Sequence, residues 1–256
     1  MQVVNSNPYV FGDVEDYLRR RFETDQRFAN TVFVLGYNII KEPFNVFKSR
    51  YPTDRIIVLN LEQLFDGSPW VNEFTMNWLM AANEVWDYDT ENIKFLRSRG
   101  IVATYTPFVY TEGLDTYPTV MEKDIDVLFY GMITPRRLTL LSNWMNPTAY
   151  KYKTVVVSGV PCTQLGEYIA RSKVLLNIHA YDRSYRQEQV RILRPVLNHT
   201  CVVSEISNYN HFGQSIVEIR DMRNLRKVLE QVLSTGAWNQ IGQDAPEKWK
   251  QLTLGK

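Results

Sequence analysis

The segment Asp124–Arg137, with the sequence DIDVLFYGMITPRR, decides how the chain folds. Its apolar run, Ile125–Tyr130, has the length and the β-branched and aromatic content of a buried strand, and Gly131 ends that run. The residues from Arg136 to Met145 then have helical spacing. A strand, a glycine turn and a helix in this order begin a strand–helix–strand unit, so the segment predicts a parallel sheet covered by helices.

The same alternation continues on both sides of this segment. Upstream, the pattern predicts strands at Thr31–Leu35, Arg55–Leu59, Glu84–Trp86 and Ile101–Tyr105, and helices at Pro43–Arg50, Pro69–Ala82 and Thr90–Arg99. Downstream, it predicts strands at Thr154–Val157, Val174–Ile178 and Cys201–Ser204, and helices at Thr163–Arg171, Tyr185–Asn198 and Met222–Leu233. Between the two series, Thr106–Asp124 contains two prolines and a glycine and has no periodicity.

This organisation predicts two Rossmann-like α/β domains of similar size. We expect an N-terminal domain of residues 1–106, a linker of residues 107–124 and a second domain of residues 125–235. Residues 236–256 are expected to form a C-terminal tail that packs back on the first domain.

The composition is that of an ordinary folded protein. The 256 residues include 29 Lys and Arg against 28 Asp and Glu, and 45% are hydrophobic, which excludes a disordered or fibrous chain. A net charge of +1 gives no overall field for binding a polyanion. Cys162 and Cys201 lie far apart without metal-ligand spacing and are expected to be reduced thiols. Because no stretch approaches a membrane span and the N-terminus is unlike a signal peptide, we expect a cytoplasmic protein.

The first candidate site follows the strand that ends at Gly131. Ligands of parallel α/β sheets bind at the carboxyl ends of the strands, and a glycine there lets the backbone pass close to a ligand. Arg136 and Arg137 then start a helix, whose first N–H groups also favour anions. The pattern fits a phosphate site, and it fits a β-turn before a solvated basic helix equally well.

Four more residues lie near predicted strand ends in the second half. Glu188 and Arg191 are three apart on a predicted helix, where a carboxylate can hold the two hydroxyls of a ribose; an exposed ion pair is the plainer interpretation. Glu205 directly follows a strand and is either part of the same edge or an ordinary loop acid. His179 ends the strand VLLNIH and suits an acid/base group, a hydrogen-bond donor to a diphosphate, or a structural histidine.

The first half offers two acidic candidates. Glu62 follows a strand and either orients an acceptor hydroxyl or braces an interface. Asp87 and Asp89 form an Asp-x-Asp triplet, a spacing that can hold a divalent cation, although Asp89 is also a natural helix N-cap. The sequence contains no Ser-His-Asp elbow, Walker loop, zinc pattern or dinucleotide fingerprint, which disfavours a hydrolase, a P-loop ATPase and a dehydrogenase.

Together these segments resemble a compact GT-B glycosyltransferase of the CgeB-like or family-4-like kind. The resemblance lies in the order and spacing of RIIVLNLEQLF, NEVWDYDTENIKFLRSRGI, DIDVLFYGMITPRR, SKVLLNIHAY and EQVRILRPVLNHTCVVSE, which touch most of Arg55–Glu205. It implies two Rossmann-like parallel-sheet domains that face a cleft. It also implies transfer of a sugar from a nucleotide-diphosphate sugar, with a UDP type favoured, to a hydroxyl acceptor, without a metal or other cofactor.

The resemblance assigns roles to the candidate residues. The donor site would comprise Gly131, Arg136, Arg137, Glu188, Arg191 and Glu205, with the diphosphate near the glycine and the arginine pair and the ribose on Glu188. His179 joins Arg136 and Arg137 as a candidate catalytic residue, and the acceptor side would include Glu62 and Asp87. The family's Glu-x7-Glu motif is incomplete, because Ala180 stands at the first acid and Asp182 is the candidate replacement, so the sugar and the stereochemical outcome stay open.

Several alternatives remain at this point. The acceptor is either a soluble glycan or, by analogy with phage and viral enzymes, a hydroxymethylated DNA base; Arg19, Arg20 and Arg21 would then contact DNA unless they form a solvated helix end. The rival functions are a non-catalytic nucleotide or sugar-phosphate binding protein and a GT-A transferase that uses Asp87 and Asp89 with manganese.

Overall fold

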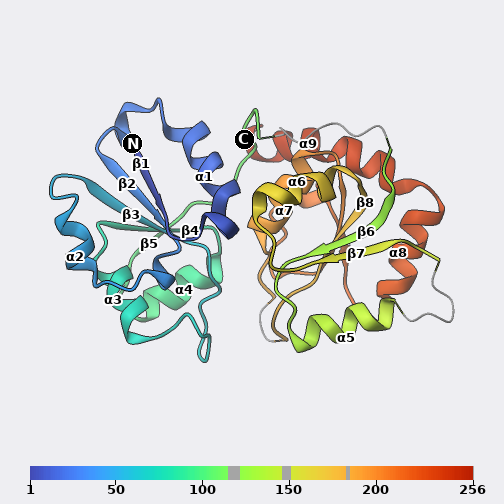
Figure 1. Ribbon diagram of the computed structural model, residues 1–256, viewed down its shortest axis with the longest axis horizontal. Helices are drawn as coiled ribbons and strands as arrows, with labels where there is room; N and C mark the ends of the chain where they lie inside the picture. Colours follow the sequence, from blue (N-terminus) through green and yellow to red (C-terminus); the bar gives the residue numbers. More distant parts are fainter. Residues whose placement is uncertain (115–121, 146–150, 183–184, 256) are drawn as a thin grey trace. The chain divides into compact units, whose positions relative to one another are not determined.

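The chain divides into two compact units, each built around one parallel five-stranded sheet (Figure 1). The computed structural model describes residues 1–114, 122–145, 151–182 and 185–255. The units are Met1–Thr111 and Glu112–Lys256. The predicted α/β class with two parallel sheets is therefore confirmed.

The sheet of the first unit has the strand order β1-β2-β3-β4-β5. These strands are β1 (Gln2–Asn5), β2 (Thr31–Leu35), β3 (Arg55–Asn60), β4 (Glu84–Asp87) and β5 (Ala103–Tyr105). The connections contain α1 (Pro8–Phe22), η1 (Gln26–Phe28), η2 (Tyr37–Ile39), α2 (Phe44–Ser49), α3 (Glu73–Ala81) and α4 (Thr90–Ser98). Strand β1 was not predicted, because it is a four-residue edge strand that is only partly buried.

The apolar runs of this unit form strands because the sheet is covered on both faces. Every residue of β2 is buried, which is the continuous apolar pattern of a central parallel strand. One face packs Phe33 of β2 and Trp86 of β4 against Phe22 and Phe28, with ring centroids 4.8–5.8 Å apart. The other face is covered by α2 and α3, which contribute Phe47 and Trp78 to the core.

The sheet of the second unit has the order β10-β9-β8-β6-β7. Its strands are β6 (Ile125–Tyr130), β7 (Thr154–Val157), β8 (Ser172–Asn177), β9 (Cys201–Glu205) and β10 (Val217–Ile219). Its helices and turns are α5 (Pro135–Trp144), α6 (Cys162–Ala170), α7 (Gln189–Leu197), η4 (Gly213–Ser215), η5 (Met222–Asn224), α8 (Leu225–Ser234) and α9 (Ala237–Leu254). The helix predicted from Tyr185 begins only at Gln189, and the three-residue edge strand β10 was not predicted.

The strand order places a topological switch point between β6 and β8. The chain runs from β6 outward to β7 and then returns to the other side of β6 to form β8. Where strand order reverses, the two following loops diverge and leave a crevice outside the carboxyl ends, which is where ligands of open α/β sheets bind. The sheet of the first unit runs in sequential order in the described residues and has no such reversal.

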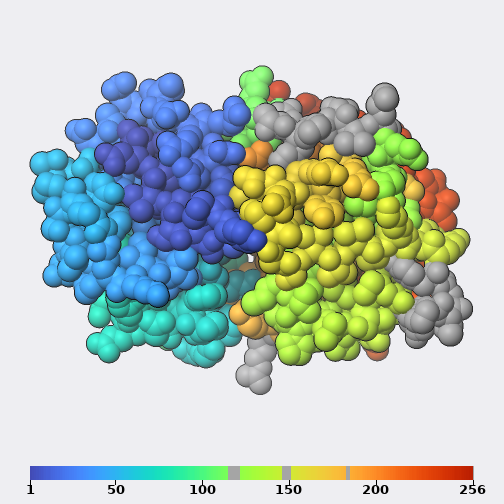
Figure 2. All heavy atoms as spheres, in the orientation of Figure 1, coloured from blue at the N-terminus to red at the C-terminus, as the bar shows by residue number. Residues whose placement is uncertain are grey.

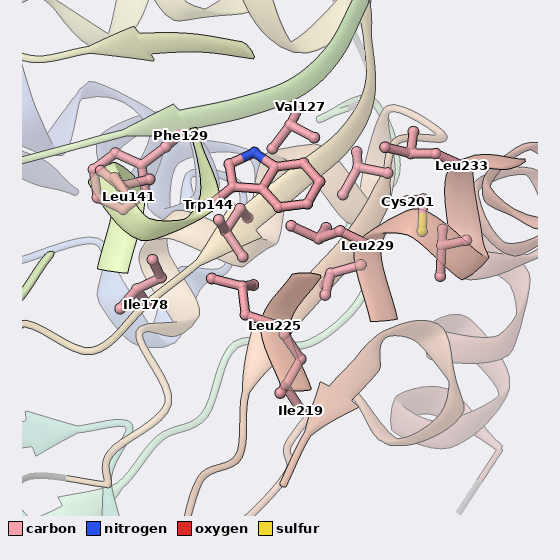
Figure 3. Close-up of a cluster of buried hydrophobic side chains, with 14 residues drawn as sticks. Val127, Phe129, Leu141, Trp144, Ile178, Cys201, Ile219, Leu225, Leu229 and Leu233 are labelled. Carbon is pink, nitrogen blue, oxygen red and sulfur yellow. The ribbon is translucent and has the colours of Figure 1, made fainter. Parts of the chain in front are cut away.

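A buried cluster fixes α5 against the second sheet. Trp144 at the end of α5 lies between Val127 of β6 and Leu229 of α8 (Figure 3), and its Nε1–H donates to Thr154 Oγ1 at 3.1 Å. The outer face of α5 is at the surface of this unit (Figure 2). Leu138 of this helix is 55% exposed. Since the helix is held at this end, its first turn has a defined position over the end of β6.

The last helix, α9, packs on the second unit. It contacts β8, β9, α7 and α8, and its closest approach is at Gly242. A Cβ at that position would lie 2.5 Å from the carbonyl oxygen of His199 and 3.0 Å from the backbone nitrogen of Cys201. Packing of the tail on the first domain and the predicted domain boundaries stay predictions.

Two smaller expectations concern the cysteines and membrane spans. Cys162 and Cys201 are both free and buried. In the part of the chain that the structure describes, no helix is both long and apolar enough to cross a membrane.

Replacing Gly242 by Ala should destabilise the second unit. The added Cβ meets rigid backbone, so we expect a loss of about 1–3 kcal/mol in the free energy of unfolding, although alanine favours helix by about 1 kcal/mol. Urea unfolding measures the change, and Gln243→Ala, on the exposed face of the same helix, is the control that should stay within about 0.5 kcal/mol of the parent. Equal stability of both variants would show that α9 does not dock as described.

Candidate functional site

The candidate site lies at the carboxyl edge of the second sheet, around the switch point. Thr134 caps the N-terminus of α5, accepting a hydrogen bond from the Arg137 backbone N–H, and Pro135 occupies the first helical position. This Thr-Pro start directs Arg136 and Arg137 toward the ends of β8 and β9.

Arg136 connects the ends of two strands. Its guanidinium donates to the Glu205 carboxylate, with Nη1 at 2.9 Å from Oε2, and to the carbonyl oxygen of His179 at 3.0 Å. Its Nε donates to Asp182 at 2.5 Å. Glu205 is the last residue of β9, is buried, and also accepts the backbone N–H of His179 at 3.0 Å. Glu205 is thus a brace between β8 and β9 as well as a partner of Arg136.

Arg137 is buried, and all three of its guanidinium nitrogens donate to protein oxygens. Nε reaches the carbonyl oxygen of Ile178 at 2.9 Å and Nη1 reaches that of Met132 at 3.0 Å. Nη2 donates to both oxygens of Glu188, at 2.6 and 2.9 Å. Burial lowers the pKa of Arg137 to about 10, so the group remains positively charged at neutral pH. The structure therefore places Arg137 beneath the site surface, while Arg136 lies at the surface.

Glu188 and Arg191 form the ion pair that their spacing predicted, but the pair is partly buried and not exposed. Their side chains are 13% and 14% exposed, and Glu188 precedes α7 at its N-cap position. Arg191 Nη1 also donates to Asn177 Oδ1 at 3.2 Å, and the guanidinium lies directly on Gly131. Gly131 has φ of +124°, and a Cβ there would lie 2.6 Å from Arg191 Nη2, so only glycine fits this position without displacing Arg191.

The formal charges of this cluster balance. Three arginines, at positions 136, 137 and 191, are matched by three carboxylates, Asp182, Glu188 and Glu205. Five of the six side chains are at most 17% exposed, whereas Asp182 is 82% exposed. Asp182 is consequently the partner that solvent, or a ligand anion, replaces most easily.

His179, expected to end the strand, lies two residues past the end of β8 and is 1% exposed. Its Nε2 is 2.9 Å from the carbonyl oxygen of Ile206, and its buried Nδ1 has no hydrogen-bond partner among the described residues. Ser207 Oγ is also buried without such a partner. Tyr185, 48% exposed, packs edge-to-face on the imidazole with centroids 6.3 Å apart. The sequence pattern pointed to His179 but not to Ser207 or Asn177, which stand in runs with no distinguishing motif.

The acidic candidates of the first unit occupy a second polar cluster, at the carboxyl ends of β3 and β4. Asp87 is fully buried and accepts from Asn60 Nδ2 at 2.7 Å, from Asn92 Nδ2 at 3.2 Å and from the Asp89 backbone N–H at 2.8 Å. Burial raises the pKa of Asp87 to about 8. Glu62, less buried, accepts from Asn38 Nδ2 at 3.3 Å.

The Asp-x-Asp triplet is engaged in structure at both positions. Asp89 caps α4, as expected, by accepting the backbone N–H groups of Glu91 and Asn92 at 2.9 Å. In residues 1–114, 122–145, 151–182 and 185–255, no group of three or more His, Cys, Asp and Glu side chains could hold a metal ion.

The three consecutive arginines lie at the opposite end of the first unit from this cluster. Helix α1 starts directly after β1, at the carboxyl edge, and Arg19, Arg20 and Arg21 are in its last turn. Fifteen helical residues span about 22 Å, so these side chains lie near the amino edge of the sheet. Arg19 is paired with Glu15 at 2.8 Å. These positions favour the solvated helix end over a ligand contact at the strand ends.

Replacing Gly131 by Ala should destabilise the second unit more than replacing Gly159 by Ala does, although both glycines have a positive φ. Gly159 has φ of +73° with open space around its Cα, so Gly159→Ala measures the backbone cost alone, about 1–2 kcal/mol. Gly131→Ala adds the contact with Arg191, and we expect a loss at least about 1 kcal/mol larger in denaturant unfolding. Equal losses would mean that Arg191 moves aside freely.

The stability of the first unit should fall as pH rises from about 4 to 8. Because the pKa of Asp87 is raised from 3.8 to about 8, the folded state holds this proton while the unfolded state releases it, so the slope is negative, at most about 1.4 kcal/mol per pH unit. Urea unfolding at a series of pH values measures the slope. Asp87→Asn removes the titrating proton, and its slope should be flatter in this range; identical slopes would contradict the assignment.

Comparison with solved structures finds the same architecture in glycosyltransferases. Sucrose-phosphate synthase from Thermosynechococcus elongatus matches with a TM-score of 0.53 at 11% identity, over 95% of this chain and 73% of that one. T4 phage BGT, in complex with UDP and Mn²⁺, matches with a TM-score of 0.52 at 11% identity, over 99% and 96% of the two chains. A mutant of S. aureus TarM, in complex with fondaparinux, α-GlcNAc-glycerol and UDP, matches with a TM-score of 0.54 at 11% identity, over 85% of this chain and 51% of that one.

Sequence comparison finds one viral relative. The chain is 30% identical over 164 residues to the uncharacterized protein L140 of Acanthamoeba polyphaga mimivirus, a match that covers 61% of this chain and 50% of that protein. The chain thus spans about half the length of the curated relative that it matches. No model of a protein family matches the chain.

The matched architecture, two parallel α/β sheets in separate units, agrees with the resemblance and rules out the rival GT-A fold. The chain has the GT-B fold of glycosyltransferases.

Proposed function

We propose that this chain is a glycosyltransferase that moves a sugar from a UDP-sugar to a hydroxyl acceptor. The observation that carries the proposal is the cluster at the switch point of the second sheet, where Glu188 pairs with Arg137 and Arg191 beside Gly131 and the neighbouring Arg136 binds Glu205 and Asp182. Two of the similar GT-B structures, T4 phage BGT and S. aureus TarM, were solved in complex with UDP. The fold supports the reaction class, and the cluster supports the place of the donor.

The cluster provides both polar contacts that a nucleoside diphosphate needs. Arg136, at the first turn of α5, is the surface cation for the diphosphate, and the exposed Asp182 is the carboxylate that the phosphates replace. Glu188 offers carboxylate oxygens to the ribose hydroxyls, and Arg137 and Arg191 hold it in place from behind. Glu205 and Arg137 orient the groups that touch the donor.

Positive charge at the diphosphate also serves the chemistry. Breaking the bond between sugar and phosphate leaves negative charge on the departing diphosphate while the sugar becomes oxocarbenium-like. Arg136 and the N–H groups at the start of α5 stabilise that charge without having to move, because Glu205 and the His179 carbonyl already fix the guanidinium. We propose that this positive charge suffices without a bound metal.

The acceptor is assigned to the first unit. Glu62 is the more accessible acid at its carboxyl edge, whereas the fully buried Asp87 orders the strand ends. A soluble glycan fits this edge better than DNA does, because the three clustered arginines of α1 lie at the other end of the sheet. We place the reaction in the cytoplasm.

A second candidate, a non-catalytic nucleotide-binding protein, is favoured by one observation. Ala180, at the position of the first acid of the Glu-x7-Glu motif, is 8% exposed and offers no carboxylate. Release of free UDP in the presence of an acceptor panel separates the two functions, because a binding protein leaves the UDP-sugar intact.

Replacing Arg136 by Gln should weaken UDP binding about 10- to 100-fold, since hydrogen bonds to a charged group are lost. Uridine, which has no phosphate, should bind the variant and the parent alike. Isothermal calorimetry with both ligands makes the comparison. Arg223→Gln, which removes a surface arginine paired with Asp221, is the matched control and should bind UDP as the parent does. Equal weakening for uridine and UDP would place the phosphates elsewhere.

A further inference from the structure

His179, beside the Arg136–Glu205 pair of the candidate site, has one ring nitrogen that the protein leaves without a partner among the described residues. Nε2 faces the carbonyl oxygen of Ile206 at 2.9 Å, and a carbonyl oxygen only accepts hydrogen bonds, so Nε2 carries the proton. In the neutral imidazole, Nδ1 then has a lone pair and no hydrogen. The His179 backbone is held as well, because its N–H donates to Glu205 and its carbonyl accepts from Arg136. One hydrogen bond therefore orients the ring, and two more hold the backbone that carries it.

That lone pair has no partner in the protein. Nδ1 is buried and without a hydrogen bond among the described residues, in a side chain that is 1% exposed. A buried polar atom without a partner is costly, and such atoms in folded proteins call for an explanation. The neighbour on one side is Tyr185, a half-exposed ring, so a surface side chain and not core packing borders the imidazole there.

With the proton on Nε2, Nδ1 of the neutral ring needs a donor as its partner. An ionised phosphate oxygen has no hydrogen to donate and does not fit that nitrogen. In a UDP-sugar the donors are the hydroxyls of the two sugars and one N–H of the base. Glu188, bound by Arg137, already suits the ribose hydroxyls, whereas the His179 carbonyl is bound by Arg136, the proposed contact of the diphosphate.

We propose that His179 binds the transferred sugar, by accepting a hydrogen bond at Nδ1 from one of its hydroxyl groups. This assignment rests on the proposed function and deepens it, because it gives the site a means of distinguishing a sugar conjugate from free UDP. His179 is then a sugar-contacting residue, in place of an acid/base group or a diphosphate donor. Ser207, the residue after Ile206, also has a buried hydroxyl without a partner among the described residues.

Two substitutions separate the two nitrogens of the ring. His179→Gln can place an amide N–H where Nε2 stands, keeping the bond to Ile206, and has no acceptor at the Nδ1 position. His179→Asn can place its amide oxygen where Nδ1 stands and loses the bond to Ile206. The first variant is expected to fold like the parent and to lose the sugar contact, and the second to be less stable and to keep it.

The measurement is the affinity of each protein for UDP and for the conjugate, among UDP-glucose, UDP-galactose and UDP-N-acetylglucosamine, that the parent binds most tightly. We expect the parent to prefer the conjugate over UDP at least about fivefold, the value of one neutral hydrogen bond. His179→Gln should bind UDP like the parent and lose the preference, whereas His179→Asn should keep it. A second series uses conjugates that each lack one hydroxyl of the transferred sugar. One of these conjugates should bind the parent about fivefold more weakly than the complete conjugate does, and should bind His179→Gln as tightly as the complete conjugate does.

The outcomes against the assignment are distinct from failure of the proposed function. A preference retained in His179→Gln, a parent without preference, or a parallel loss of UDP affinity in both variants would each overturn the sugar contact while UDP binding by the parent stands. A parent that binds none of these nucleotides would overturn the proposed function and the sugar contact together.

Discussion

The ion pair in which Arg137 Nη2 donates to both oxygens of Glu188 is the interaction on which the rest of the candidate site in the second unit depends. Arg137 lies in the first turn of α5, and its buried guanidinium binds three segments. It donates to the Met132 carbonyl in the loop after β6, to the Ile178 carbonyl just past β8 and to Glu188 before α7. Without Glu188 two buried guanidinium groups would lose a carboxylate partner, and a buried charge that loses its partner costs several kcal/mol. The loops around the switch point are therefore held by ionic contacts at their ends.

The position of Glu188 explains which residues stand around it. Gly131 is a glycine because Arg191 lies on its Cα, and Arg191 lies there because Glu188 and Asn177 hold its guanidinium. Glu205, at the end of β9, is likewise a carboxylate bound to an arginine. It accepts hydrogen bonds from the Arg136 guanidinium and from the backbone N–H of His179. A site whose polar groups are fixed before a ligand arrives loses little reorganisation energy on binding, which is what electrostatic stabilisation of a leaving group requires.

Much of this could be predicted from the sequence, and the exceptions have physical causes. The buried strands β2 and β6 were predicted with their observed bounds, because a parallel strand covered on both faces is a continuous apolar run. The edge strand β7 was also predicted with its bounds, because its sequence TVVV is β-branched throughout. The edge strands β1 (QVVN) and β10 (VEI) were missed because neither has an apolar run longer than two residues. The start of α7 was placed too early because Glu188, though spaced as a helical residue, has φ −78° and ψ 73° and is held by Arg137 instead. Local periodicity carries no information about such a long-range pair.

The same limit applies to the roles of the two adjacent arginines. From sequence, Arg136 and Arg137 are equivalent cations at a helix start, yet successive helical residues point about 100° apart. One therefore faces the solvent-accessible rim and the other turns under the loop, where it meets only carbonyl oxygens and Glu188. Of the two basic residues at this helix N-terminus, Arg136 is thus the partly exposed one and Arg137 supports the loop, and their sequence positions alone do not show which is which. By this reasoning an anion at the switch point meets Arg136 first, and Arg137 acts on it only through the carboxylate and the backbone that it holds.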